Sequence, residues 1–114
     1  MKHTTPLKEN YGFRRVYSKG KSAATPRMVL YVFPNGKPSN RMGITVSTKL
    51  GKAVVRNKVK RRFREIYRLN EDGLLCGLDI VIVARIKSTT AEYAELDEDF
   101  LYLADKLGIL QKEA

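Results

Sequence analysis

The sequence has one cysteine, one histidine and no tryptophan. The single cysteine, Cys76, cannot form a disulfide within the chain, and with His3 as the only histidine no zinc site of cysteine and histidine ligands can be assembled. Long apolar runs are also missing: none approaches the roughly 20 residues that a membrane-spanning helix needs, and the N-terminus lacks a signal-peptide core. We therefore expect a cytoplasmic protein with no membrane partner and no metal site of its own.

Acidic residues are scarce over the first 69 residues. This part holds 18 lysines and arginines against Glu9 and Glu65, a net charge of +16, whereas residues 70–114 hold four basic residues against ten acidic ones, a net of −6. The whole chain carries +10. A surface that serves solubility alone mixes the two signs. The separation of charge therefore predicts a polyanionic partner, with nucleic acid ahead of an anionic membrane surface.

Apolar residues at helical spacing predict three helices in a single domain of 114 residues, preceded by a flexible start at 1–6. Asn10 is predicted to cap the first helix and Gly20 to end it in the left-handed conformation. The third helix is predicted to start at the capping-box pattern Thr89-x-x-Glu92 and to end at Gly108. The first two helices are expected at 10–20 and 53–69.

Segments rich in β-branched and aromatic residues predict strands at 27–33, 41–47 and 79–84, with a further short strand near 21–24. A turn-forming loop joins 27–33 to 41–47 and predicts a hairpin. The strand at 79–84 is apolar throughout, so we expect it to be buried on both faces. The order α-β-β-β-α-β-α predicts an α+β fold with the helices on one side of a small sheet.

The segment 52–68 is strongly basic: eight of its 17 residues are Lys or Arg and one is acidic. At about 100° per residue, its apolar residues form one stripe: Val55, Val59, Phe63 and Ile66. Six polar residues form a separate arc: Arg56, Asn57, Lys60, Arg61, Arg64 and Arg68. Arginine binds two phosphate oxygens at once, and the amide of Asn57 can pair with a base edge or a sugar.

Other interpretations of this helix are a solvated charged face and a membrane-surface helix. Like charges four residues apart repel, so a single-signed face is poorly suited to stability alone, and the domain core needs the apolar stripe. We therefore favour RNA binding. Asn57 has its own alternative, a tolerated surface residue near the helix start.

Residues 56–65, RNKVKRRFRE, resemble the signature helix of the bacterial ribonuclease P protein family. The resemblance covers most of residues 7–107, in the family's order. It includes F-x-x-V-Y-x-x-G at 13–20, VLY at 29–31, RMGITVS followed by KLGKAV at 41–54, and DIVIVAR at 79–85. Two departures are Tyr17, where the family often has Phe, and a less basic segment before Asn10.

The resemblance implies a two-layer sandwich of a four-stranded sheet and three helices, similar to domain 2 of ribosomal protein S5. It implies a left-handed connection from the third strand through the basic helix to the fourth, against the general preference. It also implies that an RNA subunit with bound Mg²⁺ removes the 5′ leader of precursor tRNA. The polypeptide would bind both RNAs, need no protein partner or cofactor, and have no catalytic residue; we interpret Asp72 and Asp79 as loop and strand-end residues.

The basic helix would then contact the catalytic RNA, and a central cleft would bind the leader. By position, the resemblance assigns the cleft to Phe13, Tyr17 and Tyr31, with Lys49 as a phosphate contact. Aromatic and basic side chains together suit single-stranded RNA, although core packing is an alternative for the three aromatic residues. Two other functions remain: a ribosomal or translation-associated RNA-binding protein of similar fold, and a nuclease that cleaves without RNA.

Overall fold

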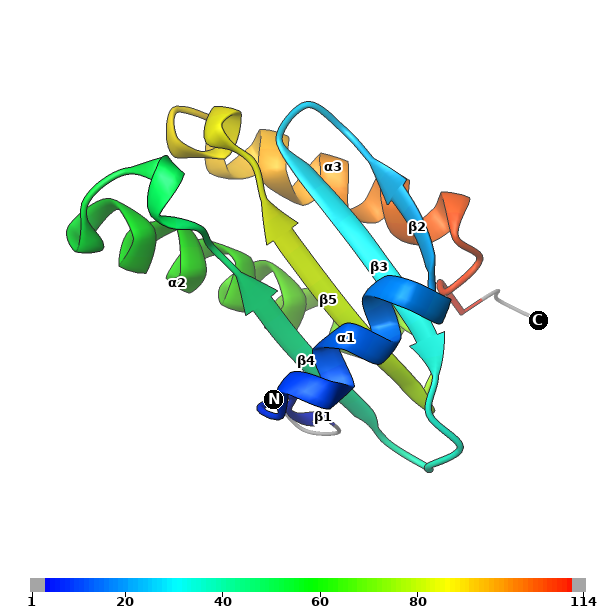
Figure 1. Ribbon diagram of the computed structural model, residues 1–114. Coiled ribbons are helices and arrows are strands. Elements are labelled where there is room, and N and C mark those ends of the chain that lie inside the picture. Colours follow the sequence, from blue (N-terminus) through cyan, green and yellow to red (C-terminus); the bar gives the residue numbers. More distant parts are fainter. Residues whose placement is uncertain (1–3, 112–114) are drawn as a thin grey trace.

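The computed structural model describes residues 4–111, which form one five-stranded sheet with helices on both faces (Figure 1). The helices are α1 (Asn10–Lys19), α2 (Ala53–Asn70) and α3 (Tyr93–Lys106). The strands are β1 (Thr4–Pro6), β2 (Lys21–Ala24), β3 (Met28–Pro34), β4 (Asn40–Thr45) and β5 (Leu78–Ala84). Short 3₁₀ turns are η1 (Thr48–Leu50), η2 (Glu71–Gly73) and η3 (Ile86–Thr89). These elements confirm the predicted α+β class, with one strand, β1, that was not predicted.

The strand order is β1-β4-β5-β3-β2, so β5 is the central strand. It pairs in parallel with β4 and antiparallel with β3, and its residues Ile80, Val81 and Ile82 are fully buried, as expected. The predicted hairpin between 27–33 and 41–47 is wrong, because β5 lies between these two strands. A strand that is apolar on both faces buries the most apolar surface when it lies at the centre of the sheet, which explains why β5 lies between β3 and β4.

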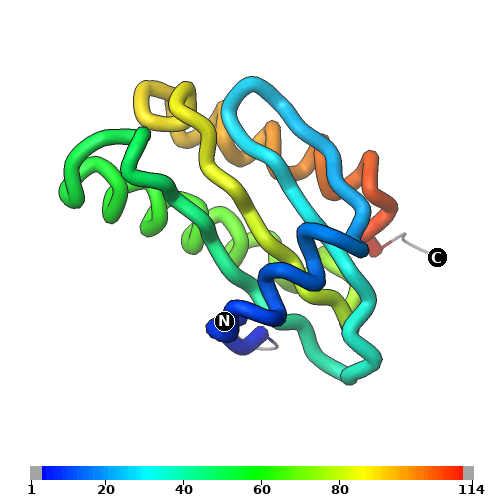
Figure 2. The backbone as a smooth tube through the Cα atoms, viewed as in Figure 1, coloured from blue at the N-terminus to red at the C-terminus, as the bar shows by residue number. Residues whose placement is uncertain are grey.

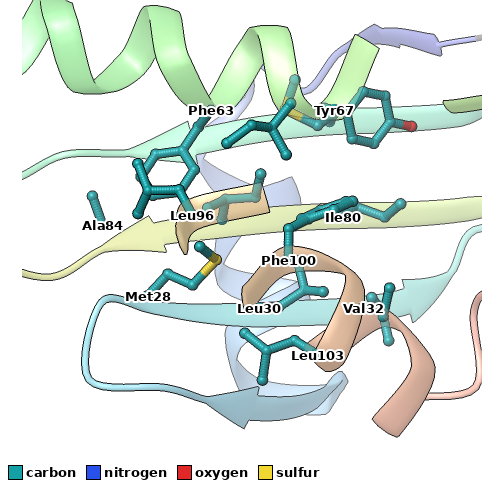
Figure 3. Packing of buried hydrophobic residues seen from close by; sticks show 14 of the residues in the cluster. Met28, Leu30, Val32, Phe63, Tyr67, Ile80, Ala84, Leu96, Phe100 and Leu103 are labelled. Carbon is teal, nitrogen blue, oxygen red and sulfur yellow. The ribbon is translucent and has the colours of Figure 1, made fainter. Parts of the chain in front are cut away.

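Alternation along the strands divides the apolar residues between two faces. Met28, Leu30 and Val32 of β3 face α2 and α3, and Figure 3 shows these residues packed with Phe63, Tyr67, Phe100 and other side chains of the two helices. On the opposite face, Val16 of α1 packs with Leu7 of the β1–α1 connection and Val81 of β5. The expectation that all helices lie on one side is therefore wrong for α1, since β5 is apolar on both faces and needs cover on both.

Helix α2 connects two adjacent parallel strands, β4 and β5. In Figure 1, α1 crosses in front of the sheet and α2 lies behind it. When both strands are turned to point upward, β5 lies to the right of β4. The connection is therefore left-handed, as the resemblance implies and against the general preference. It places the basic helix along the β4 side of the sheet (Figure 2).

The ends of the helices differ in detail from the predicted caps. Glu9, not Asn10, is the N-cap of α1, and Gly20 has an ordinary φ of −75°. Gly20 is required for space instead, because a Cβ there would lie 2.5 Å from the carbonyl oxygen of Val16. The capping box of α3 joins Glu92 to Glu95, since the Thr89 hydroxyl already donates to the carbonyl of Ile86 in η3. Gly108, predicted to end the third helix, follows the C-cap residue Leu107 and has a φ of +72°.

Strand β1 lies within the segment expected to be flexible; residues 1–3 of that segment lie outside the described residues. It pairs in parallel with β4, and the hydroxyls of Thr4 and Tyr67 form a hydrogen bond of 2.8 Å. Pro6 fits an edge strand because it has no N–H to donate. The strand covers the outer edge of β4 and brings the N-terminal segment next to α2. Among residues 4–111, no helix is long and apolar enough to cross a membrane.

Candidate nucleic-acid interface

Four of the six polar residues predicted on one arc of α2 are exposed and available to a partner. Asn57, Lys60, Arg61 and Arg64 make no side-chain hydrogen bond or ion pair within residues 4–111. We call these four residues the open arc. Since no carboxylate within the described residues offsets its lysine and two arginines, the open arc is a cationic surface without internal neutralisation.

The other two predicted arc residues are engaged within the protein. The guanidinium of Arg56 donates to the carbonyl of Gly51 over 3.2 Å, at the start of the helix. Arg68 donates to both carboxylate oxygens of Glu65, over 2.6 and 3.1 Å. The hydrogen bond from Arg68 lowers the pKa of Glu65. Arg68 is therefore partly neutralised, and the cationic character is strongest in the middle of α2.

The buried stripe of α2 agrees with the predicted one at three of its four positions. Val59, Phe63 and Ile66 are buried as expected, but Val55 is exposed and Tyr67, which was not predicted, is fully buried. Tyr67 is buried because its hydroxyl has a polar partner in Thr4 of β1, a strand that was not predicted. Outside the arc, Arg62 donates to the carbonyl of Ala91 over 3.1 Å and ties α2 to the segment before α3.

The three aromatic residues assigned to a cleft lie together on the α1 face of the sheet. The ring centroids of Phe13 and Tyr17 are 6.3 Å apart, and those of Tyr17 and Tyr31 are 5.0 Å apart in an edge-to-face arrangement. The hydroxyls of Tyr17 and Thr45 form a hydrogen bond of 2.7 Å across to β4. Phe13 and Tyr31 are half-buried and Tyr17 is 38% exposed, so the group both packs and presents aromatic surface.

An open stretch of sheet continues from this aromatic group. Helix α1 crosses one end of the α1 face, and no helix within the described residues covers the other end (Figures 1 and 2). There Thr45, Val83 and Val29 form a row across β4, β5 and β3, and all three are half-buried. A shallow apolar surface bordered by aromatic rings suits an extended chain of unpaired bases better than a folded partner.

Lys49 does not join the aromatic group. It lines a separate hollow of about 730 Å³ beyond the ends of β4 and β5, together with Arg85 and Lys87. These two further cations were not among the predicted site residues. Arg85 and Lys87 follow the predicted strand at 79–84 as isolated basic residues. The signal that identified α2, a long run of lysines and arginines, is therefore absent there.

A buried ion-pair network fixes the position of α1. The Asp79 carboxylate is fully buried and accepts two hydrogen bonds from Arg41, of 2.8 and 2.7 Å, and one from Asn35. Arg15 of α1 reaches the same carboxylate over 3.5 Å and lies over the ring of Phe33. Burial alone would raise the pKa of Asp79, but the hydrogen bonds from Arg41 and Asn35 outweigh it and hold the pKa below its ordinary value. Asp79 therefore anchors structure.

Comparison with known proteins gives a consistent result. The family model described as Ribonuclease P matches residues 1–108. The chain is 41% identical to the ribonuclease P protein component of Natranaerobius thermophilus over 112 residues, which covers 98% of this chain and 97% of that protein. It is 44% identical to the same component of Clostridium acetobutylicum over 106 residues, 91% of this chain and 89% of that protein.

Two solved structures agree with the fold. The RNase P protein of Staphylococcus aureus superposes with a TM-score of 0.85 at 31% identity and covers 93% of this chain and 97% of its own. The RNase P protein of Thermotoga maritima superposes with a TM-score of 0.78 at 34% identity and covers 85% of this chain and 92% of its own.

Proposed function

The chain belongs to the ribonuclease P family, and from this premise we propose that it is a non-catalytic, RNA-binding subunit of that enzyme. It binds the catalytic RNA through α2 and the 5′ leader of precursor tRNA through the aromatic group, and so assists endonucleolytic removal of the leader by the RNA subunit. The observation that carries the proposal is the open arc, an unneutralised cationic surface whose Lys60 and Arg64 line a hollow together with Phe13 of the aromatic group.

The open arc suits the catalytic RNA because its cations follow the sugar-phosphate backbone at successive turns of a rigid helix. Arg61 and Arg64 offer planar groups that bind two phosphate oxygens each. Asn57, one turn earlier, adds an amide that pairs with a base edge or sugar. Phosphate contacts of this kind fix register and orientation, which is what an assisting subunit supplies to a catalytic RNA.

The aromatic group and the open sheet suit the leader, which is single-stranded. Tyr17 and Tyr31 present rings on which any base can stack, so binding would tolerate varied leader sequences. The half-buried row of Thr45, Val83 and Val29 continues this surface along the sheet. Lys49, in its separate hollow, would bind leader phosphates farther along the chain, together with Arg85 and Lys87.

We assign no catalytic residue to the polypeptide. Within residues 4–111 there is no group of three or more His, Cys, Asp or Glu side chains that could hold a metal ion. The buried carboxylate of Asp79 already accepts hydrogen bonds from Arg41 and Asn35, so it is not free to act as a base or a ligand. As the family resemblance implies, we assign the Mg²⁺ of the reaction to the RNA subunit, and this chain's residues bind and orient RNA.

A reconstitution assay tests the proposal. The purified protein, a bacterial ribonuclease P RNA, and the two together are each incubated with a precursor tRNA labelled in its leader. At low Mg²⁺ we expect the protein to accelerate release of the leader by the RNA and to release none alone. Failure to stimulate the RNA would favour a ribosomal or translation-associated role, and cleavage by RNA-free protein would favour a protein nuclease.

A further inference from the structure

A hollow of about 290 Å³ lies where β1, α1, β4 and α2 meet. Its lining is divided by chemistry. Lys60 and Arg64 of α2 supply two cations, Phe13 supplies an aromatic ring, and the rest is mostly apolar, from residues such as Leu7, Met42 and Ile44. Phe13 therefore borders both the aromatic group and this hollow, which joins the two proposed RNA surfaces.

The two cations of the hollow have no internal partner. Lys60 and Arg64 lie one turn apart and make no ion pair within residues 4–111. The carboxylate closest to them along α2, Glu65, is already bonded to Arg68. Like charges at this spacing repel each other and destabilise a helix. The arrangement is relieved when an anion binds between them.

We propose that this hollow binds a single unpaired nucleotide of RNA, with its base against Phe13 and the apolar wall and its phosphate on Lys60 and Arg64. The proposal rests on the proposed function and adds to it a discrete site, separate from the open sheet. An amphipathic hollow with cations on one helix and apolar surface elsewhere matches the two halves of a nucleotide.

The size of the hollow selects among RNA elements. Ligand pockets commonly start at about 300 Å³, so this one is limited to one small group and excludes a duplex. A free inorganic phosphate would use the cations but leave the apolar wall in water. A nucleotide turned out of its stack uses both, and it can come from a bulge or joining segment of the catalytic RNA or from the leader.

Pro6 allows the hollow to be filled without changing the cations. It lines the hollow, is exposed, and lies on the edge strand. The next backbone amide, that of Leu7, donates to the carbonyl of Met42 over 2.9 Å. Alternate residues of a strand point their N–H groups to opposite sides, so the nitrogen at position 6 faces away from β4 and its substitution breaks no ladder bond. Pro6→Trp places a large ring in the hollow.

Thr5→Trp is the matched control, because Thr5 is exposed on the same strand but does not line the hollow. The chain has no tryptophan, so each variant carries a single fluorescent reporter. Blue-shifted emission from Pro6→Trp alone would verify that the hollow is filled. If the tryptophan ring of Pro6→Trp stays exposed, Ile44→Phe is used in its place. Ile44 lines the hollow, and the larger side chain of phenylalanine reduces its volume.

Binding of each variant is measured to the catalytic RNA alone and, in the assembled complex, to precursor and mature tRNA. Since base stacking contributes to the affinity, we expect the filled hollow to weaken binding about tenfold to one of these RNAs, and we expect Thr5→Trp to bind as the wild type does. Weaker binding to the catalytic RNA in the absence of tRNA would identify that RNA as the source of the bound nucleotide. Weaker binding to precursor tRNA, with binding to mature tRNA unchanged, would identify the leader as the source.

An abasic scan of the identified RNA completes the test. Removing the bound base should weaken binding to the wild-type protein about tenfold and add no further loss to the filled variant. The proposal is wrong if a filled hollow leaves every affinity unchanged, or if Thr5→Trp weakens binding equally. Those results would leave the proposed function intact, because that function is tested separately, by stimulation of the catalytic RNA with the wild-type protein.

Discussion

The ring of Phe13 lies directly against the backbone of Gly43. A Cβ built on Gly43 would be 2.4 Å from Cζ and 2.6 Å from Cε1 of Phe13, closer than real Cβ atoms approach such carbons. The glycine in the middle of β4 therefore sets how closely α1 lies on the sheet. Because Phe13 shares α1 with Tyr17, the same contact positions the aromatic group.

Gly43→Ala is expected to displace Phe13 and with it α1. Overpacking of this kind typically costs about 1–3 kcal/mol, so the melting temperature should fall, and stimulation of precursor tRNA processing should weaken. Gly73→Ala is the control, because no atom lies within 4 Å of a Cβ built there. Thermal unfolding of both variants measures the difference. Equal stability of the two variants would show that α1 adjusts freely.

The open arc is expected to bind phosphates. Arg61→Ala and Arg64→Ala should each lower the slope of log affinity for the catalytic RNA against log salt by about 0.7–0.9, the value for one phosphate contact. Arg56→Ala and Arg68→Ala should lower it less, because Gly51 and Glu65 already engage these side chains. Lys106→Ala, on the acidic helix α3, is the control. Unchanged slopes in both Arg61→Ala and Arg64→Ala would refute phosphate binding.

The Asp79 network is expected to give the protein part of its acid sensitivity. The pKa of Asp79 is lowered in the folded protein, so its contribution to stability is fully present above the unfolded pKa, about 4, and is lost as the pH falls through the folded pKa. Asp79→Asn leaves Arg41 without its charge partner and should cost about 3 kcal/mol at neutral pH.

Denaturant unfolding at several pH values tests this contribution. The free energy of unfolding of Asp79→Asn should decline less steeply below about pH 4 than that of the wild type. Asp105→Asn, an exposed acid on α3, should keep the wild-type slope. Parallel pH profiles for Asp79→Asn and the wild type would mean that another carboxyl group dominates acid unfolding.

Local patterns were sufficient to predict most elements, and long-range pairing was not. The alternation and apolar content of 27–33, 41–47 and 79–84 identified three strands near their observed bounds. The pairing of these strands was wrong, because a turn-forming loop favours a hairpin and no local signal indicates that a later strand will lie between its arms. Strand β1 was missed for the same reason: Thr4–Pro6 has no pattern of its own and forms only against the edge of β4.

The candidate site shows a similar division. Periodicity placed Lys60, Arg61 and Arg64 correctly on one exposed face, because a helix repeats regardless of its surroundings. It could not show that Glu65 engages Arg68, or that Lys49 lies apart from the aromatic group with Arg85 and Lys87. Those contacts depend on side-chain conformation and on segments brought together by the fold. The grouping of Phe13, Tyr17 and Tyr31 came from the family resemblance, and the structure places them together.

Tyr31 is expected to contact a base of the leader. Its ring is half-buried, packs edge to face with Tyr17 and borders the open end of the α1 face. A base stacked there contributes about 1–3 kcal/mol, so Tyr31→Ala should weaken binding of precursor tRNA to the assembled enzyme by that amount. Mature tRNA has no leader, and its affinity should be nearly unchanged. Equilibrium binding of the two RNAs measures the difference.

Tyr17→Phe separates stacking from packing. It removes the hydroxyl that bonds to Thr45 but keeps the ring, so leader binding should persist if the ring is what the leader contacts.

Tyr31→Leu, in turn, retains apolar bulk against Tyr17 but offers no ring for a base. If Tyr31→Leu binds precursor tRNA as the wild type does, Tyr31 is a packing residue. If Tyr31→Ala weakens precursor and mature tRNA equally while staying folded, the leader does not lie on this ring. If both Tyr31 variants lose affinity for precursor tRNA alone and Tyr17→Phe keeps it, an unpaired leader base lies on Tyr31. The two Tyr31 variants share the loss of an aromatic ring, whereas Tyr17→Phe retains its ring.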